Sequence, residues 1–173
     1  MKKAVNVPLL LMCGAVAFCI AVTAMHAGLR QRQLEAEKVT AEKNKKAGEA
    51  FLADNKTKQG VVTLPSGLEY KILKAGEGKR PTADDTVVCD YLGTLIDGTM
   101  FAGSHNRPNL ATFSVKGVIK GWTEALPLMP VGSEWQLFVP SQLAYGVRGS
   151  SRFIGPNATL IFDMKLLSIS SRP

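Results

Sequence analysis

Histidine and cysteine are scarce in this chain of 173 residues, which contains two histidines and three cysteines. Cys13 and Cys19 lie in an apolar segment near the amino terminus, so Cys89 has no partner for an internal disulfide in the remainder. A catalytic thiol would need a histidine, and His105 is the only candidate in the same part of the chain. No constellation of metal ligands or of acid and base residues is visible. We therefore expect neither thiol catalysis nor a metal or other cofactor.

The sequence also lacks a tight run of basic residues interleaved with aromatic ones. Its formal net charge of +7 is spread along the chain, which argues against binding of nucleic acid. With 46% hydrophobic residues over 173 positions, the chain can bury a core but is too short for two ordinary domains. We expect one folded domain.

The amino terminus has the pattern of an export signal. Two lysines at positions 2 and 3 precede an apolar run from Val7 to about Ala27, as in secretory signals. Val22, Thr23 and Ala24 have small or slim side chains at the positions that a signal peptidase reads, which favours cleavage after Ala24. An uncleaved anchor is the first alternative, because about 20 apolar residues span a bilayer; lipid attachment at a cysteine is the second.

We therefore assign residues 1–24 to a signal peptide or membrane anchor. The rest of the protein is expected to be exported, to the periplasm, the cell envelope or the medium. A membrane is expected as a partner only if the amino-terminal segment stays uncleaved.

Residues 25–60 are predicted to form a charged helical stalk or linker. Charged residues and alanines dominate the stretch 29–59, which has Gly48 as its only glycine and no proline, and this favours a helix. Its few apolar residues do not repeat as a sustained heptad. We therefore expect a solvated helix and a monomer, with pairing of two chains through the helix as the alternative.

From residue 61 the pattern becomes that of a β-rich domain. Strands are predicted over Leu68–Lys74, Thr86–Ile96, 111–115, 133–139 and 159–168. Asp97-Gly98 predicts a hairpin turn. A helix is predicted over Ile119–Met129 and should end or distort near Leu126, because Pro127 removes a backbone donor. One helix against an antiparallel sheet is an α+β arrangement.

Cys89 alternates with Val87 and Tyr91 along the second of these strands. Alternate residues of a strand share one face of the sheet, so Cys89 is predicted to be buried as a small apolar residue.

A set of short motifs then follows in a distinctive order. They are Tyr91-x-Gly93, Asp97-Gly98, Phe101, Phe113, Val118-Ile119-Lys120-Gly121-Trp122, Ala144-Tyr145-Gly146 and Pro156-x-Ala158-Thr159-Leu160. Through this combination residues 61–170 resemble the FKBP-type peptidyl-prolyl cis-trans isomerases, most closely their macrophage infectivity potentiator branch. The resemblance implies a twisted antiparallel sheet wrapped around one short helix, here preceded by the charged helical stalk.

The resemblance further implies an apolar aromatic pocket that accelerates rotation about X-Pro bonds in exported proteins. The catalytic residues it implies are Tyr91, Phe101, Trp122, Tyr145 and Phe162. The substrate-binding residues it implies are Phe113, Val118, Ile119, Phe153 and Ile154. The resemblance also implies that Trp122 forms the floor, that the Tyr145 hydroxyl donates a hydrogen bond to a ligand carbonyl, and that the Ile119 N–H binds another. Proline-containing peptides or proteins are the expected partners, and macrolides the expected inhibitors.

One position departs from the family pattern. Family members usually have Phe-Asp-Ser where this chain reads Phe101-Ala102-Gly103-Ser104. The aspartate normally accepts a hydrogen bond from the tyrosine matching Tyr91, which an alanine side chain cannot do, and Asp90 points to the other face by alternation. We therefore expect weakened turnover and weakened macrolide binding. A proline-directed binding module or chaperone with little turnover is the alternative function.

Overall fold

The computed structural model describes residues 7–104, 110–150 and 153–170, with side chains from residue 25 onward. It contains two compact units, Met1–Val39 and Thr40–Pro173. Helix α1 (Val7–Asn55) has residues in both units. It confirms the helix predicted for the stalk and ends about one turn earlier than expected. The expected cleavage site after Ala24 lies at the edge of residues 1–24, whose side chains are outside the described part of the structure. Within the described part of the chain, no helix is both long and apolar enough to cross a membrane.

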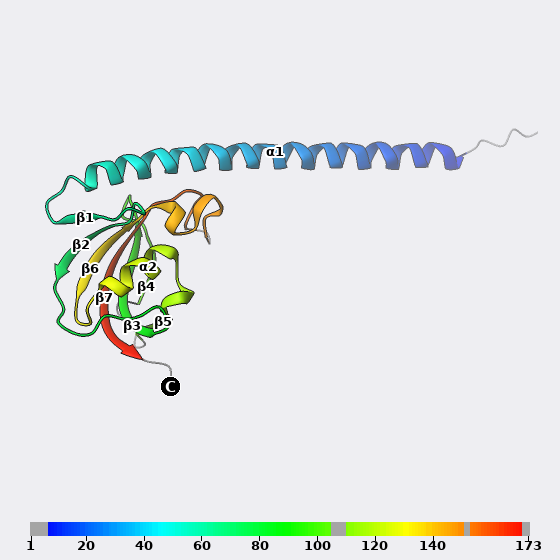
Figure 1. Ribbon diagram of the computed structural model, residues 1–173. Helices are drawn as coiled ribbons and strands as arrows, with labels where there is room; N and C mark the ends of the chain where they lie inside the picture. The colour runs from blue at the N-terminus through cyan, green and yellow to red at the C-terminus, as the bar shows by residue number, and fades with distance from the viewer. Residues whose placement is uncertain (1–6, 105–109, 151–152, 171–173) are drawn as a thin grey trace, which may run out of the picture. The chain divides into compact units, whose positions relative to one another are not determined.

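Seven strands follow α1 in the described residues and pair into one antiparallel sheet (Figure 1). They are β1 (Val61–Thr63), β2 (Glu69–Lys74), β3 (Thr86–Leu95), β4 (Met100–Gly103), β5 (Ala111–Ser114), β6 (Glu134–Val139) and β7 (Leu160–Ser170). Their order is β1-β2-β6-β7-β3-β4, with β5 also paired to β3. The predicted Asp97-Gly98 hairpin is confirmed, with Gly98 at a φ of 84°. The short strands β1 and β4 were not predicted.

Strand β3 has partners along both of its edges. One of its edges pairs with β7 from Thr86 opposite Ser170 to Leu95 opposite Leu160. Its other edge is shared, because β5 pairs with its first half and β4 with its second half. Side chains from β3, β4, β5 and β7 are thereby brought to one end of the sheet.

One face of the sheet packs against the short helix α2 (Lys120–Ala125). Alternate residues of β7 are buried on this face, as the period of a strand requires: Leu160, Phe162, Met164 and Leu166. Burying each such side chain contributes roughly 1.5–3 kcal/mol to folding. The predicted α+β fold is thus confirmed, with the sheet curving around a single short helix (Figure 1).

The predicted break at Pro127 is also confirmed. Helix α2 ends at Ala125, and the chain tightens into the 3₁₀ turn η2 (Leu126–Leu128). The helix approaches β6 closely at Gly121, where an added Cβ would lie 2.5 Å from Val139 Cγ1. Glycine is therefore required for the packing that sets the position of Trp122.

The last turns of α1 pack on the domain, whereas the sequence predicts a solvated helix. The rings of Phe51 and Phe138 lie 5.9 Å apart. Asn55 Nδ2 donates a 2.8 Å hydrogen bond to Glu69 Oε2, and both of these polar residues are 2% exposed. All four residues belong to the unit Thr40–Pro173. The end of the helix is therefore part of the domain's own packing.

Candidate active site

Trp122 lies at the centre of a group of aromatic rings. Its indole meets Tyr91 at 5.1 Å and 85°, Phe113 at 5.3 Å and 87°, and Phe162 at 5.1 Å and 77°. Phe101 meets Phe162 at 5.6 Å and 88°. Edge-to-face pairs of this kind are favoured because the positive ring edge faces the negative ring face. The rings therefore form a rigid frame, drawn from α2, β3, β4, β5 and β7.

These five aromatic residues line a cavity. The cavity has a volume of about 500 Å³ and is lined by Tyr91, Phe101, Ala102, Phe113, Gly117, Val118, Ile119, Trp122, Ala144, Tyr145 and Phe162. A volume of this size suits a small ligand or a few residues of a peptide. The lining side chains are aromatic or aliphatic, with polar atoms only on the two tyrosines and Trp122, so the site can bind an apolar group and offer hydrogen bonds to it.

Gly93 lets two of these rings approach the backbone of β3 closely. A Cβ on Gly93 would lie 2.8 Å from Phe101 Cζ and 3.0 Å from Phe162 Cε1. Contacts this short force the ring atoms to move, so a larger residue would push the two rings out of their edge-to-face arrangement. The glycine thus sets the shape of the cavity wall without touching a ligand itself.

The segment before α2 forms the second wall and is held by polar contacts. The Ile119 carbonyl accepts hydrogen bonds from the N–H groups of Trp122 and Thr123 at 2.9 and 3.0 Å. Thr123 Oγ1 donates a 3.0 Å bond to the Val115 carbonyl. These bonds join the 3₁₀ turn η1 (Val115–Gly117) to the first turn of α2. Val118 lies between them and faces the cavity.

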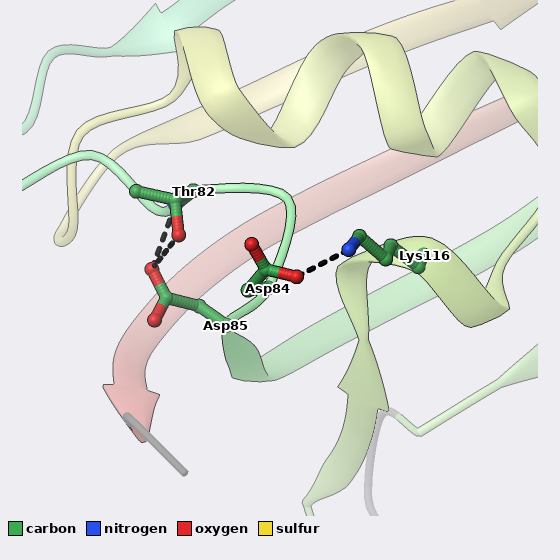
Figure 2. A network of polar contacts seen from close by, with 4 residues as sticks. All are labelled: Thr82, Asp84, Asp85 and Lys116. Atoms are coloured by element: carbon green, nitrogen blue, oxygen red, sulfur yellow. Dashed lines mark hydrogen bonds and ion pairs between the residues drawn. The ribbon is translucent and has the colours of Figure 1, made fainter.

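A surface network anchors the same wall to the loop before β3 (Figure 2). Thr82 donates to Asp85 Oδ2 from its backbone at 2.7 Å and from its hydroxyl at 2.9 Å. These two donors hold the pKa of the Asp85 carboxyl below its ordinary value. The Asp85 carbonyl accepts from the Val115 N–H at 3.0 Å, and Lys116 pairs with Asp84. The turn that precedes Val118 is therefore tied to the sheet.

Strand β4 is fixed to β3 through Ser104. Ser104 Oγ donates to Asp90 Oδ1 at 2.8 Å and accepts the Tyr91 N–H at 2.8 Å. The Ser104 N–H donates to the Tyr91 carbonyl at 2.9 Å. Asp90 does not line the aromatic cavity, in agreement with its expected orientation. Ala102 does line it, between Phe101 and the serine.

The structure gathers eight of the ten residues named in the sequence analysis around this cavity. Phe153 and Ile154 are not among the lining residues. Phe153 is 54% exposed, whereas Ile154 is 6% exposed and belongs to the core. Gly117 and Ala144 line the cavity but were not named as site residues. Ala144 stood within a quoted motif; Gly117, without a side chain, gave no signal.

Cys89 is fully buried on β3, as predicted, and burial raises its pKa to about 12. His105 lies outside the described residues. Among the side chains that are described, no three metal-ligating groups come together.

A family model decides which proteins this chain is related to. Residues 77–167 match the model described as FKBP-type peptidyl-prolyl cis-trans isomerase, which is more than half of the chain. Residues 19–72 match the domain amino terminal to FKBP-type peptidyl-prolyl isomerase. The chain belongs to the FKBP-type peptidyl-prolyl cis-trans isomerase family.

Individual relatives agree with FKBP membership. The chain is 57% identical over 129 residues to "Outer membrane protein MIP" of Legionella longbeachae, which covers 75% of this chain and 55% of that protein. It is 42% identical over 153 residues to "FKBP-type 22 kDa peptidyl-prolyl cis-trans isomerase" of Escherichia coli, covering 87% of this chain and 74% of that protein. The family and branch predicted from the sequence are confirmed.

The FKBP fold is confirmed by a solved structure as well. The crystal structure of FkpA from Escherichia coli matches with a TM-score of 0.85 at 32% identity, over 99% of this chain and 85% of that one. The chain spans about half the length of the first curated relatives it matches.

Proposed function

We propose that this FKBP-type protein accelerates cis–trans isomerisation of X-Pro bonds in exported peptides and proteins. The observation that carries the proposal is the cavity of about 500 Å³ built around Trp122 and its edge-to-face partners. A proline ring is compact and apolar, so it fits a site whose walls are made of aromatic and aliphatic side chains.

The reaction needs no acid, base or nucleophile. Resonance in the C–N bond creates a rotational barrier of ~18–20 kcal/mol, and unaided X-Pro isomerisation takes ~10–100 s. The planar imide is more polar than the twisted state, in which resonance is lost. Withdrawing the bond from water into an apolar cavity therefore disfavours the planar state relative to the twisted one.

We assign the roles as follows. Trp122 forms the floor for the proline ring, with Phe101 and Phe162 at its sides. Tyr145, which is 40% exposed, donates a hydrogen bond from its hydroxyl to a substrate carbonyl at the mouth. The backbone N–H of Ile119 binds a second carbonyl. These two bonds orient the peptide while the cavity acts on the bond that rotates.

The remaining sequence-named residues have supporting parts in this proposal. Tyr91, Phe113 and Val118 form the walls. Ile154 acts through packing, because it is buried in the core, and exposed Phe153 contacts only the flanks of a bound chain.

Export, domain limits and assembly belong to the same proposal. Residues 1–24 are removed or serve as an anchor, residues 25–60 form the stalk, and residues 61–170 carry the isomerase domain. The protein acts as a monomer outside the cytoplasm and binds macrolides more weakly than relatives with the usual aspartate. Mass spectrometry of the mature protein tests export: an amino terminus at Met25 supports cleavage, and an intact Met1 contradicts it.

The proposed activity is tested with a short Leu-Pro peptide, by following the approach of its cis form to equilibrium after a solvent jump. The rate constant is expected to rise in proportion to protein concentration above the spontaneous value. A rate that stays at the spontaneous value while the peptide binds would contradict the proposal and favour the binding module.

A further inference from the structure

The end of α1 is joined to the segment before β7 by two side-chain hydrogen bonds. Asn44 Nδ2 donates to the Pro156 carbonyl at 2.9 Å, and Asn157 Nδ2 donates to the Ala41 carbonyl at 3.3 Å. All four residues lie in the unit Thr40–Pro173. One bond runs from the helix to the segment and the other runs back. Together they fix both the distance and the orientation of the two pieces of backbone.

Gly48 allows this contact to be close. It lies one turn beyond Asn44, on the same side of α1. A Cβ on Gly48 would lie 2.2 Å from Thr159 Oγ1, so any larger residue would force the helix away from the segment. Glycine is unfavourable within a helix, and the close approach to Thr159 explains its presence here.

Asn157 also connects this contact to the cavity. Its backbone N–H donates a 2.8 Å hydrogen bond to the Gly146 carbonyl. It has a φ of 56°, and among the described residues no other non-glycine residue has a positive φ. Asparagine tolerates this left-handed conformation better than most residues. The side chain of Asn157 thus contacts α1, while its backbone contacts Gly146, next to Tyr145 in the cavity lining.

The Gly146 carbonyl belongs to the residue directly after Tyr145. It also accepts the Gly149 N–H at 3.3 Å, which closes the 3₁₀ turn η4 (Gly146–Arg148). Tyr145 lines the mouth of the cavity and is 40% exposed, so neighbouring side chains leave much of it uncovered. Its position therefore depends strongly on how its own backbone is held.

We propose that Asn44 and Asn157 are positioning residues for Tyr145, so that the end of α1 serves the isomerase site without lining the cavity. The catalytic part of this inference rests on the proposed function, in which the Tyr145 hydroxyl binds a substrate carbonyl. Misplacing such a group by about 1 Å can lower a rate by up to about 10²-fold. The helix would then influence turnover through a path of hydrogen bonds that ends at Gly146.

A double-mutant cycle in the full chain tests this path. Asn157→Gly keeps the backbone N–H and tolerates the positive φ but removes the bond to Ala41. We expect it to lower kcat/KM about fivefold in the natural protein and less than about twofold in a Tyr145→Phe background, because coupled residues are not additive. Glu49→Ala, at an exposed position of the same helix, is the control and is expected to change neither value. Equal losses in both backgrounds would overturn the proposal.

Amide hydrogen exchange tests the same coupling without any turnover. Asn44→Ala is expected to speed exchange of the Asn157 amide about tenfold or more, because the segment that carries this amide is no longer held to α1 through Pro156. The Glu49→Ala control should leave that amide unchanged. Unchanged exchange in Asn44→Ala would overturn the coupling itself. Absence of turnover in the natural protein would instead remove the proposed function, and the catalytic role of Tyr145 with it.

Discussion

The indole of Trp122 and the ring of Phe162 meet edge to face, with their centroids 5.1 Å apart and their planes at 77°. Trp122 comes from α2 and Phe162 from β7, so this contact joins the helix to the sheet at the bottom of the cavity. Both residues are almost fully buried within the domain, yet both line the cavity. The same rings thus stabilise the fold and form the proposed binding surface.

Replacing Trp122 is therefore expected to affect both stability and activity. Trp122→Leu should lower the free energy of unfolding by about 2–4 kcal/mol, because it leaves a space in the core. It should lower kcat/KM by more than about tenfold, because the floor of the cavity is lost. Chemical denaturation and peptide isomerisation measure the two effects.

Trp135 offers a matched control for that experiment. It is also 4% exposed and stacks on Tyr70 with centroids 4.4 Å apart, but it does not line the aromatic cavity. Trp135→Leu should cost a similar amount of stability while changing kcat/KM less than about twofold. An equal loss of activity in both variants would mean that the activity follows stability and not the cavity.

Ala102 is expected to limit turnover. It lines the cavity, and its side chain offers no hydrogen-bond acceptor. Ala102→Asp should raise kcat/KM by about tenfold, since one hydrogen bond made in the transition state contributes roughly 1–3 kcal/mol. Ala102→Val adds volume without an acceptor and should give no increase. A lower activity for Ala102→Asp would show that the natural site works by another arrangement.

Gly48 should tolerate alanine poorly, although alanine is the better helix former. An added Cβ would meet Thr159 Oγ1 at 2.2 Å, so Gly48→Ala is expected to lower the free energy of unfolding by about 1–3 kcal/mol. Gly28→Ala in the same helix meets nothing within 4 Å and should be neutral or raise helicity. Thermal unfolding of both variants compares them. A stabilised Gly48→Ala would contradict the described packing of α1.

Cys89 should be chemically inert in the folded protein. Its thiol is fully buried and its pKa is raised to about 12 by desolvation, so the reactive thiolate is scarce at neutral pH. Alkylation followed by peptide mapping should label Cys89 only after denaturation. The mapping separates it from the two amino-terminal cysteines. Rapid labelling of Cys89 in the native protein would show that β3 opens readily.

Glu69 should make stability depend on pH. Burial raises its pKa above the ordinary value of 4.5, against smaller opposing effects of Asn55, Lys56 and Lys58. The folded state then holds a proton more tightly than the unfolded state, so this contribution to stability is present at low pH. It is lost as the pH rises from the ordinary value through the raised one.

Glu69→Gln keeps an acceptor for Asn55 and removes the buried charge. The variant should gain stability relative to the natural protein as the pH rises from below 4.5 to neutral. Glu49→Gln, at an exposed position, should show no such trend. A constant difference in the free energy of unfolding across this range would contradict the account of Glu69.

Local patterns in the sequence predicted most of the domain. A strand was predicted over 159–168, where β7 lies, and Pro127 predicted the end of α2. These features depend on neighbours in the chain, so they can be read without the fold. The aromatic set around Trp122 was found through the order of the family motifs, because its members come from separate strands.

Contacts between distant segments could not be predicted in this way. The hydrogen bond from Asn55 to Glu69 and the packing of Phe51 on Phe138 join α1 to the sheet. They need only a few residues of the helix, so the sequence of α1 has the thin apolar stripe of a solvated helix and does not reveal them. Phe153 and Ile154 are adjacent, yet one is exposed and the other buried. The path of an irregular loop decides this difference, and composition alone does not reveal it.

NMR exchange spectroscopy on a Leu-Pro peptide tests the central claim most directly, because it reports the exchange rate and the cis and trans populations together. At a protein concentration far below that of the peptide, the account predicts faster exchange with unchanged populations, and loss of the effect in Trp122→Leu. Exchange at the spontaneous rate, with a shift of populations only when protein and peptide are equimolar, would contradict catalysis and identify a binding module.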